Sequence, residues 1–181
     1  MDGKSFLLEP VSPDEGLPPA VLCRLRQADG KALYVYEFLH PAVAATVAVF
    51  DRSRGAFLLI RRERAPFAGA YAFPGGFIDV GREDIYQTAV REAREEAGVQ
   101  LAREDLVLVD VRSRPDRDPR DHVFDIGFLA EIDRAHAQAL DETTDIRWAS
   151  PREIDALELA FDHAEFWANV KRLRAQRQAS P

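Results

Sequence analysis

Carboxylate side chains crowd one stretch of the sequence, between residues 83 and 96. Glu83 and Glu92 are followed by the adjacent pair Glu95 and Glu96, and Arg91 stands among them. Like charges this close on a helix repel one another, so an ordinary solvated face would usually space them differently. Carboxylates are hard oxygen ligands, which suit Mg²⁺ or Mn²⁺ better than zinc. The stretch therefore indicates a divalent-cation site, with a solvated acidic helix face as the alternative.

The segment 84–97 is predicted to be a helix whose core face and acidic face lie on opposite sides. Glu83 and Asp84 favour its first turn, and Gly98 is a natural stop after its last one. The apolar stripe expected on an ideal helix consists of Tyr86, Val90, Ala93 and Ala97. The nearly opposite arc consists of Glu92, Glu95 and Glu96.

A glycine-rich turn stands just ahead of this helix. The sequence Pro-Gly-Gly at 74–76 follows the strand-like segment 70–73 and makes a tight exit that exposes backbone carbonyls. The helix begins a few residues later and aims its carboxylates back at them. No arrangement of cysteine and histidine offers a competing zinc site. Turn and helix together favour the cation site over the solvated face.

Residues 76–99 resemble the Nudix box, G-x5-E-x7-R-E-U-x-E-E-x-G-U, in which U is aliphatic. From Glu83 onward the charged residues match in type and spacing, and only Ala93 is small for its aliphatic position. Six residues separate Gly76 from Glu83, one more than in the family. We expect the extra residue to form a bulge in the loop, where Arg82 is a candidate to take the place of the glutamate.

The resemblance implies hydrolysis of a nucleoside diphosphate linked to another group, with Mg²⁺ as cofactor and Mn²⁺ as a possible substitute. A pyrophosphate is protected by its own charge, which a cation must neutralise before a nucleophile approaches. The implied metal ligands are the Gly75 carbonyl, Glu92, Glu95 and Glu96. Arg91 is implied to hold the glutamates in place by hydrogen bonds, and Glu83 to support them.

The resemblance leaves the general base open. It is either Glu92 or an acid on a later loop, Glu142, with Asp141 or Asp145 in reserve.

Three further stretches resemble ADP-ribose pyrophosphatases: residues 61–77, 114–130 and 159–166. They imply that the substrate is ADP-ribose, cleaved to AMP and ribose 5-phosphate. The implied substrate contacts are Arg62, Phe67, Arg114, Arg117 and Arg120. Solvated arginines and a core phenylalanine are the alternative for these positions. His163 is expected to be a packing residue at a helix start rather than a catalyst.

Two other functions stay open at this point. One is a house-cleaning hydrolase that removes damaged nucleoside triphosphates. The other is a sensor that binds ADP-ribose without turnover. Regulators of the sensor kind add a DNA-binding region, and we expect none here because the sequence ends one helix after residue 163. The complete set of glutamates also favours turnover.

Composition limits the class of protein. The chain has 181 residues, of which 46% are hydrophobic and 30% charged, so a soluble globular protein with one ordinary core is expected. A net charge of −7 argues against a general nucleic-acid binder. Cys23 is the single cysteine, which favours a reducing compartment. No apolar run approaches membrane-span length, so a cytoplasmic location without membrane partners is expected.

Aromatic and β-branched runs predict a mixed α/β chain. The predicted strands lie at 31–39, 44–50, 56–61, 105–112, 122–132 and 145–150, and a last helix lies at 161–178. The resemblance implies a Nudix-type α/β/α sandwich with a mixed central sheet. It divides the chain into an N-terminal extension, 1–41, and a Nudix domain, 42–181. The extension is a possible dimerisation element, and the resemblance implies a homodimer.

Overall fold

The computed structural model describes residues 6–10, 21–27, 32–36, 41–133, 137 and 143–179. The chain divides into two compact units, Met1–His40 and Pro41–Pro181. In the first unit, three antiparallel strands form a sheet in the order β1-β2-β3. Their bounds are β1 (Phe6–Pro10), β2 (Val21–Gln27) and β3 (Ala32–Tyr36). The sequence predicted β3 but neither of its neighbours, because arginines and a proline interrupt their apolar runs.

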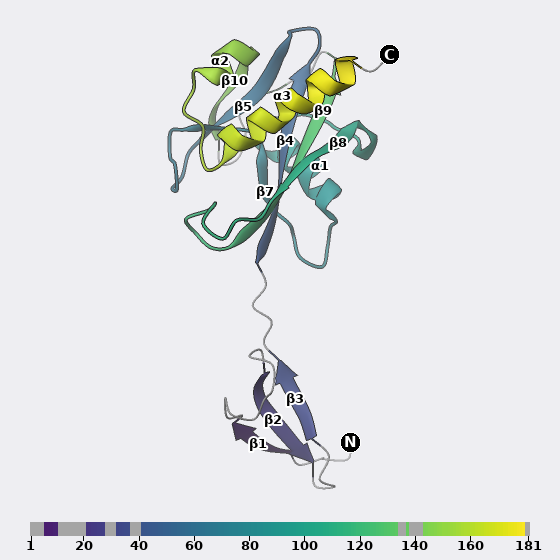
Figure 1. Cartoon of the computed structure of the whole chain (residues 1–181), viewed down its shortest axis with the longest axis vertical. Coiled ribbons are helices and arrows are strands. Elements are labelled where there is room, and N and C mark those ends of the chain that lie inside the picture. The colour runs from purple at the N-terminus through teal and green to yellow at the C-terminus, as the bar shows by residue number, and fades with distance from the viewer. Residues whose placement is uncertain are drawn as a thin grey trace. The chain divides into compact units, whose positions relative to one another are not determined.

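The second unit is built on one mixed sheet (Figure 1). Its main strands run in the order β10-β5-β4-β9-β8, while β6 pairs with β5 and β7 pairs with β4. Their bounds are β4 (Ala42–Asp51), β5 (Ala56–Arg62), β6 (Tyr71–Ala72), β7 (Gly75–Phe77), β8 (Leu106–Arg112), β9 (Val123–Ile132) and β10 (Thr143–Ala149). The central strands β4 and β9 are parallel, whereas the other described pairs are antiparallel.

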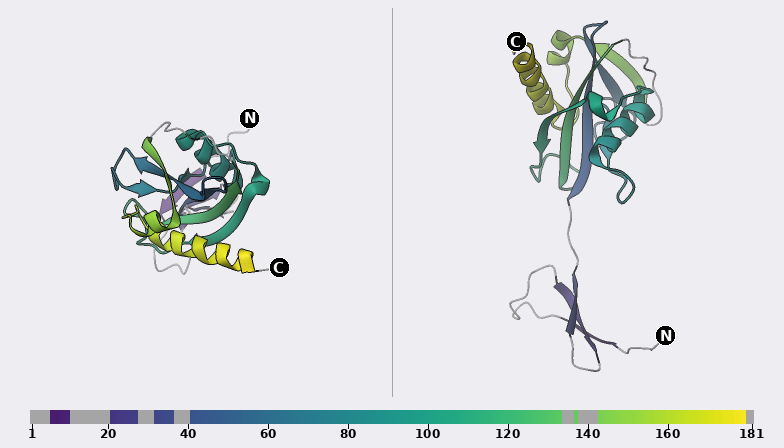
Figure 2. Two further views of the ribbon diagram at one scale, coloured as in Figure 1. Left: turned by 90° about the horizontal axis from the view of Figure 1, so that it is seen from above. Right: turned by 90° about the vertical axis from the view of Figure 1, so that its right-hand side faces the viewer.

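Helices cover both faces of this sheet, α1 (Ile85–Ala97) on one side and α3 (His163–Ala179) on the other (Figure 2). The 3-10 helix η2 (Arg103–Asp105) and the short helix α2 (Pro151–Asp155) complete the unit. Successive side chains of a strand point to opposite faces. Accordingly, Val47 and Val49 of β4 lie in the core beneath α1, and Ala48 lies in the core beneath α3. The predicted α/β sandwich with a mixed central sheet is confirmed.

Helix α1 begins and ends where its sequence signals lie. Asp84 caps the first turn by accepting hydrogen bonds from two backbone N–H groups, and Gln87 completes a capping box. Gly98 ends the helix in the left-handed conformation, with a φ of 68°. Ala93 and Ala97 are fully buried, so the helix lies close to the sheet. Its carboxylates are therefore left on the side that faces the glycine turn.

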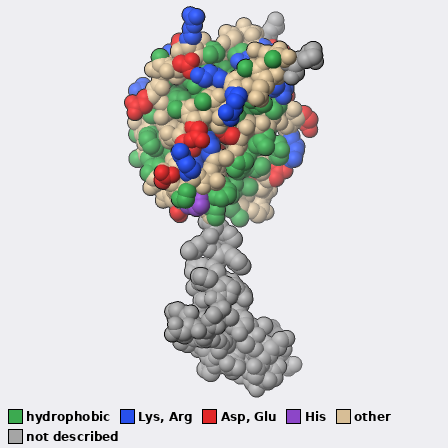
Figure 3. All heavy atoms as spheres, viewed as in Figure 1, with side chains coloured by type: hydrophobic (Ala, Val, Ile, Leu, Met, Phe, Trp, Pro, Cys, Tyr) green, Lys and Arg blue, Asp and Glu red, His purple; other side chains and the backbone are tan. Residues whose placement is uncertain are grey.

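Helix α3 packs its first two turns against the sheet. Phe166 and Val170 are fully buried in the core beneath it, and Trp167 is nearly so. The helix begins two residues later than predicted, because Phe161 takes a left-handed conformation with a φ of 52°. Within the described ranges, no helix combines the length and the apolar character that a membrane span needs. On the face shown in Figure 3, acidic and basic side chains are interspersed.

Candidate functional site

A cavity of about 730 Å³ lies between the glycine turn, α1 and the two segments that lead into β9 and α3. One part of its wall is acidic and consists of Glu92, Glu95 and Glu96. Another part is basic and aromatic and consists of Arg62, Arg64, Arg117, Arg120, Phe73, Phe77 and Phe161. The cavity therefore joins carboxylates, which suit a cation, to side chains that suit phosphates and rings.

Arg91 is the centre of the acidic part. Its Nη1 donates to Glu92 Oε1 at 2.7 Å and to Glu95 Oε2 at 3.0 Å. Its Nε and Nη2 bind the two oxygens of Glu83 at 3.0 and 2.8 Å, and Nη2 also donates to the Phe77 carbonyl at 2.9 Å. The hydrogen bond from Arg91 lowers the pKa of Glu83 to about 2. One guanidinium thus holds three carboxylates and the strand before the loop in a fixed arrangement.

The extra loop residue leaves Glu83 in reach of Arg91. The N–H groups of Arg82 and Glu83 donate to the Asp79 carbonyl and close a turn in which Gly81 has a φ of 79°. Glu83 Oε1 accepts the Asp79 N–H at 2.8 Å, which ties both ends of the turn together. The Arg82 side chain is 80% exposed and pairs with Asp79 at 3.3 Å. Arg82 therefore points away from the position that it was a candidate to occupy.

The glycine turn and α1 make close contact. The Gly75 N–H donates to Glu96 Oε2 at 2.9 Å. A Cβ atom at Gly76 would lie only 2.3 Å from Glu92 Oε1, so this position has room for glycine alone unless the carboxylate moves. Burial raises the pKa of Glu92, against the opposing influence of Arg91. The turn and the carboxylates of Glu92 and Glu96 therefore lie against each other in the wall of the cavity.

The oxygen donors in this part of the cavity fit a hard divalent cation. Glu92, Glu95 and Glu96 offer carboxylate oxygens, and Gly75 offers its backbone within the same cavity. In the part of the chain that the structure describes, no three acidic, histidine or cysteine groups already converge as a metal cluster. Because Glu92 and Glu95 are bonded to Arg91, they would have to share their oxygens between the guanidinium and a cation.

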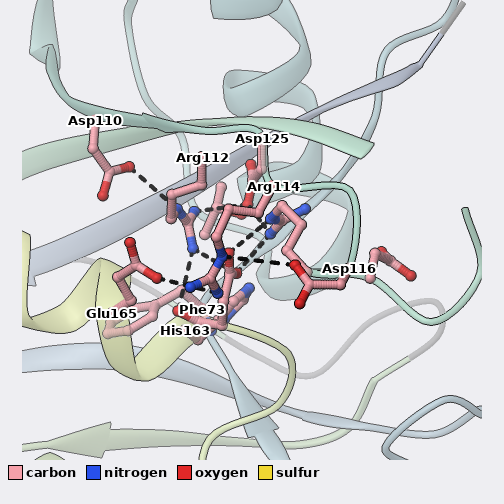
Figure 4. A network of polar contacts seen from close by, with 12 residues as sticks. Phe73, Asp110, Arg112, Arg114, Asp116, Asp125, His163 and Glu165 are labelled. Atoms are coloured by element: carbon pink, nitrogen blue, oxygen red, sulfur yellow. Dashed lines mark hydrogen bonds and ion pairs between the residues drawn. The ribbon is translucent and has the colours of Figure 1, made fainter. Parts of the chain in front are cut away.

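A buried ion network supports the basic part of the cavity (Figure 4). Arg117 binds Asp162 through Nε and Nη2 at 2.7 and 2.6 Å, and Asp125 Oδ2 through Nη2 at 3.1 Å. Arg112 binds the same two acids at 2.8 and 2.7 Å. Thr46 donates to Asp125 Oδ2 at 2.8 Å. Burial raises the pKa of Asp125, and the charges of the two arginines oppose that rise.

The structure brings only some of the predicted substrate contacts together. Arg62, Arg117 and Arg120 line the cavity. Arg114 is 65% exposed and pairs with Glu165 at 3.5 Å, outside the cavity lining. Phe67 is 44% exposed and also lies outside that lining, against the ring of Phe161. Glu142 and Asp141 fall outside the described residues.

Several cavity residues were not predicted from the sequence. One of them is Phe161. The guanidinium carbons of Arg62 and Arg120 lie 4.8 and 5.1 Å from the centroid of its ring. Arg120 also lies over Phe77 at 4.7 Å. Asp125 is a charged residue between the apolar residues Phe124 and Ile126 of a predicted strand, and that charge was the signal that could have found it.

His163 lies where the sequence placed it, buried at the start of α3. Its Nδ1 accepts the Phe73 N–H at 3.1 Å, which links α3 to the residue before the glycine turn. Burial, and next the charge of Arg112, lower the pKa of His163 to about 3. The side chain is 5% exposed and forms part of the cavity wall.

Comparisons with known proteins show which family the sequence resembles. A sequence model described as "NUDIX domain" matches residues 40–170. An ADP-ribose pyrophosphatase of Methanocaldococcus jannaschii is 37% identical over 126 residues, which make up 70% of each chain. An "ADPR responsive transcriptional repressor NtrR" of Acinetobacter baylyi is 28% identical over 131 residues, 70% of this chain and 52% of the repressor.

Solved structures show the same fold. A MutT/nudix family protein from Enterococcus faecalis has a TM-score of 0.59 at 30% identity, over 63% of this chain and 45% of that one. The NUDIX domain of Shewanella oneidensis NrtR, solved with ADP ribose, has a TM-score of 0.68 at 23% identity. That match covers 75% of this chain and 89% of the NrtR chain, and at this identity it speaks for the fold alone.

Proposed function

This chain belongs to the Nudix family, and we propose that it hydrolyses ADP-ribose to AMP and ribose 5-phosphate with the help of Mg²⁺. The observation that carries the proposal is the single cavity that joins the α1 carboxylates to Arg62, Arg117 and Arg120. Its volume of about 730 Å³ lies within the range typical of small-molecule sites. The 37% identical ADP-ribose pyrophosphatase supports this choice of substrate.

The proposed cation ligands are the Gly75 carbonyl, Glu92, Glu95 and Glu96. A Mg²⁺ ion held by these ligands would neutralise pyrophosphate charge and would make water a better nucleophile. Arg91 holds Glu92 and Glu95 by hydrogen bonds, and Glu83 holds Arg91 in turn. These hydrogen bonds orient the carboxylates before substrate binds, so the carboxylates need not reorganise during the reaction.

Two acids are proposed as alternatives for the general base. Glu92 lines the cavity, and burial favours its protonated form, which makes it a stronger base once ionised. Glu142 is the alternative that the family resemblance implies. Replacing each with glutamine and measuring the turnover number against pH distinguishes them, because loss of the base removes the acidic limb of the profile.

The arginine side chains are proposed to bind the phosphates and the rest of the nucleotide. Arg117 is held on two sides by Asp125 and Asp162, so it presents a fixed charge. Arg62 and Arg120 lie against the ring of Phe161, where a base or ribose has both a cation and an aromatic face to contact. Direct contacts from Phe67 and Arg114 stay predictions.

The wider setting is also part of the proposal. We propose a homodimer in the cytoplasm, with Mg²⁺ replaceable by Mn²⁺ and no nucleic acid or membrane partner. Residues 1–41 would serve as a dimerisation extension, and residues 42–181 as the Nudix domain. The separate three-stranded sheet within Met1–His40 supports the idea of a distinct extension.

A second candidate is an ADP-ribose sensor that does not turn over its ligand. The 28% identical repressor described as responsive to ADPR favours it. The intact contacts among Glu83, Arg91 and Glu92 favour the enzyme instead.

A substrate panel separates these functions from house-cleaning of damaged triphosphates. Products are measured with Mg²⁺ present for ADP-ribose, NADH, nucleotide sugars, diadenosine compounds and 8-oxo-dGTP. The proposal predicts that ADP-ribose has the highest kcat/KM and yields AMP. Tight binding of ADP-ribose without product would identify a sensor, and preference for 8-oxo-dGTP would identify a house-cleaning enzyme.

A further inference from the structure

The two ring nitrogens of His163 have different surroundings. Nδ1 accepts the backbone N–H of Phe73 at 3.1 Å. Nε2 makes no hydrogen bond with the part of the chain that the structure describes. The His163 side chain is almost fully buried and stands in the wall of the cavity. With Nδ1 engaged by the backbone, Nε2 is the ring nitrogen that stays available to a molecule in the cavity.

The contact with Phe73 fixes the tautomer of this ring. A backbone N–H can only donate, so Nδ1 must carry a lone pair and no proton. The proton of the neutral ring then resides on Nε2, which becomes a hydrogen-bond donor. Burial and the charges of Arg112 and Arg117 disfavour a second proton on the ring, and they outweigh Asp162, which favours one. His163 therefore offers an uncharged donor whose direction is set by the backbone.

The neighbours of the ring indicate what such a donor can bind. The centroid of Phe161 lies 5.9 Å from that of His163, and the centroid of Phe73 lies 6.0 Å away. The cavity arginines are better partners for phosphate oxygens than a neutral histidine, because they provide positive charge as well as hydrogen bonds. A neutral donor among aromatic rings suits an uncharged oxygen or nitrogen acceptor, as found on a sugar or a base.

We propose that His163 is a substrate-binding residue that donates from Nε2 to an uncharged acceptor on the sugar or base part of the nucleotide. The inference deepens the proposed function and rests on it. It gives the histidine two separate tasks, one for each nitrogen. Nδ1 holds the residue before the glycine turn, and Nε2 helps to select the substrate.

Two substitutions separate these tasks. In His163→Asn the amide oxygen can take the place of Nδ1, while nothing replaces Nε2. In His163→Gln the amide nitrogen can reach the position of Nε2, while the acceptor for Phe73 is lost. We expect His163→Asn to raise KM for ADP-ribose about tenfold with a smaller change in kcat and a melting temperature near wild type. We expect His163→Gln to melt earlier but to have a lower KM than His163→Asn.

His122→Asn is the matched control, because His122 lies outside the cavity lining and its ring contacts the Ser113 carbonyl at 3.0 Å. KM should not change in this control. Inhibition by inorganic pyrophosphate, which has neither sugar nor base, should be equal in wild type and His163→Asn. A wild-type KM in His163→Asn would overturn the inference, as would a tenfold weaker inhibition by pyrophosphate.

Calorimetric titration with ADP-ribose in the absence of Mg²⁺ keeps the inference separate from the proposed function. If wild type binds ADP-ribose without hydrolysing it, the proposed function fails, and the affinity ratio between wild type and His163→Asn still decides the role of His163. A tenfold weaker affinity in the variant supports that role, whereas equal affinities overturn it. If wild type neither binds nor hydrolyses ADP-ribose, both proposals fail.

Discussion

At the scale of single residues, the acidic part of the cavity depends on one cation surrounded by carboxylates. Arg91 uses its guanidinium to bind Glu83, Glu92 and Glu95 at once. Such charge-assisted contacts are stronger than neutral hydrogen bonds and have defined directions. The repulsion expected among neighbouring glutamates is thereby offset.

Gly76→Ala tests whether activity depends on the close approach of Gly76 to the Glu92 carboxylate. The added Cβ would meet Glu92 Oε1 at 2.3 Å and displace a carboxylate on which the proposed cation site depends. We expect kcat/KM to fall about 100-fold, the typical cost of misplacing a reacting group by about 1 Å. Steady-state kinetics and a melting curve measure this. Gly81→Ala is a control for backbone strain, because a Cβ there would meet nothing within 4 Å. Equal losses in both variants would contradict the account.

Glu83→Gln tests the contact between Arg91 and the loop through pH. The pKa of Glu83 is lowered from its ordinary value of 4.5 to about 2, so its charged form stabilises the folded chain above pH 4.5. That contribution is lost as the pH falls from 4.5 toward 2. The difference in unfolding free energy between wild type and Glu83→Gln should therefore shrink across this window, as measured by urea denaturation. A difference in unfolding free energy that does not vary with pH would contradict a stabilising role for the contact between Glu83 and Arg91.

The sequence predicted the acidic residues well because helix geometry fixes their spacing. Glu92, Glu95 and Glu96 had to share a face once α1 was recognised. The path of the loop before Glu83 was not predictable, since the sequence does not reveal the left-handed conformation that Gly81 takes there. Phe161 was missed for a similar reason, because its left-handed backbone turns the side chain toward the cavity instead of extending α3.

At the scale of elements, a buried ion network joins β8, β9 and the start of α3 to the cavity. Asp125 of β9 and Asp162 before α3 are shared by Arg112 and Arg117. Charges removed from water are tolerated only when each one has partners. The network therefore fixes the segment that carries Arg117 relative to the sheet.

Asp125→Asn measures what this network contributes. The change keeps the size of the side chain but leaves Arg112 and Arg117 with one carboxylate fewer in a buried position. We expect a loss of about 3–5 kcal/mol in unfolding free energy. Arg114→Ala is the control, because that arginine is 65% exposed and its loss should cost at most about 0.5 kcal/mol. Equal costs for the two variants would argue against the network.

The elements themselves were predictable to different degrees. Strands β4, β5 and β9 are long apolar runs, and the cap signals at Asp84 and Gly98 gave the bounds of α1 to within a residue. The short strands β6 and β7 pair with β5 and β4. The strand-like segment 70–73 contains β6, whereas β7 has no local signal, because its three residues become a strand only by pairing with β4.

At the scale of the whole molecule, the chain consists of two units with separate sheets. A chain that begins at Pro41 tests the proposed role of the first unit. We expect it to sediment as a monomer and the full chain as a dimer of two 20.3 kDa subunits. Sedimentation equilibrium measures both masses. The proposal for residues 1–41 fails if the two chains have the same subunit number.

The measurement that tests the central claim most directly is AMP release from ADP-ribose as a function of Mg²⁺ concentration. It compares wild type with Glu96→Gln, and Arg82→Ala serves as control because its side chain is 80% exposed. We predict saturable activation by Mg²⁺ in wild type and in the control. Glu96→Gln should lose about 100-fold or more in rate, because the proposed cation site loses an anionic ligand. Undiminished AMP release by Glu96→Gln, or by wild type in the presence of a chelator, would contradict the account.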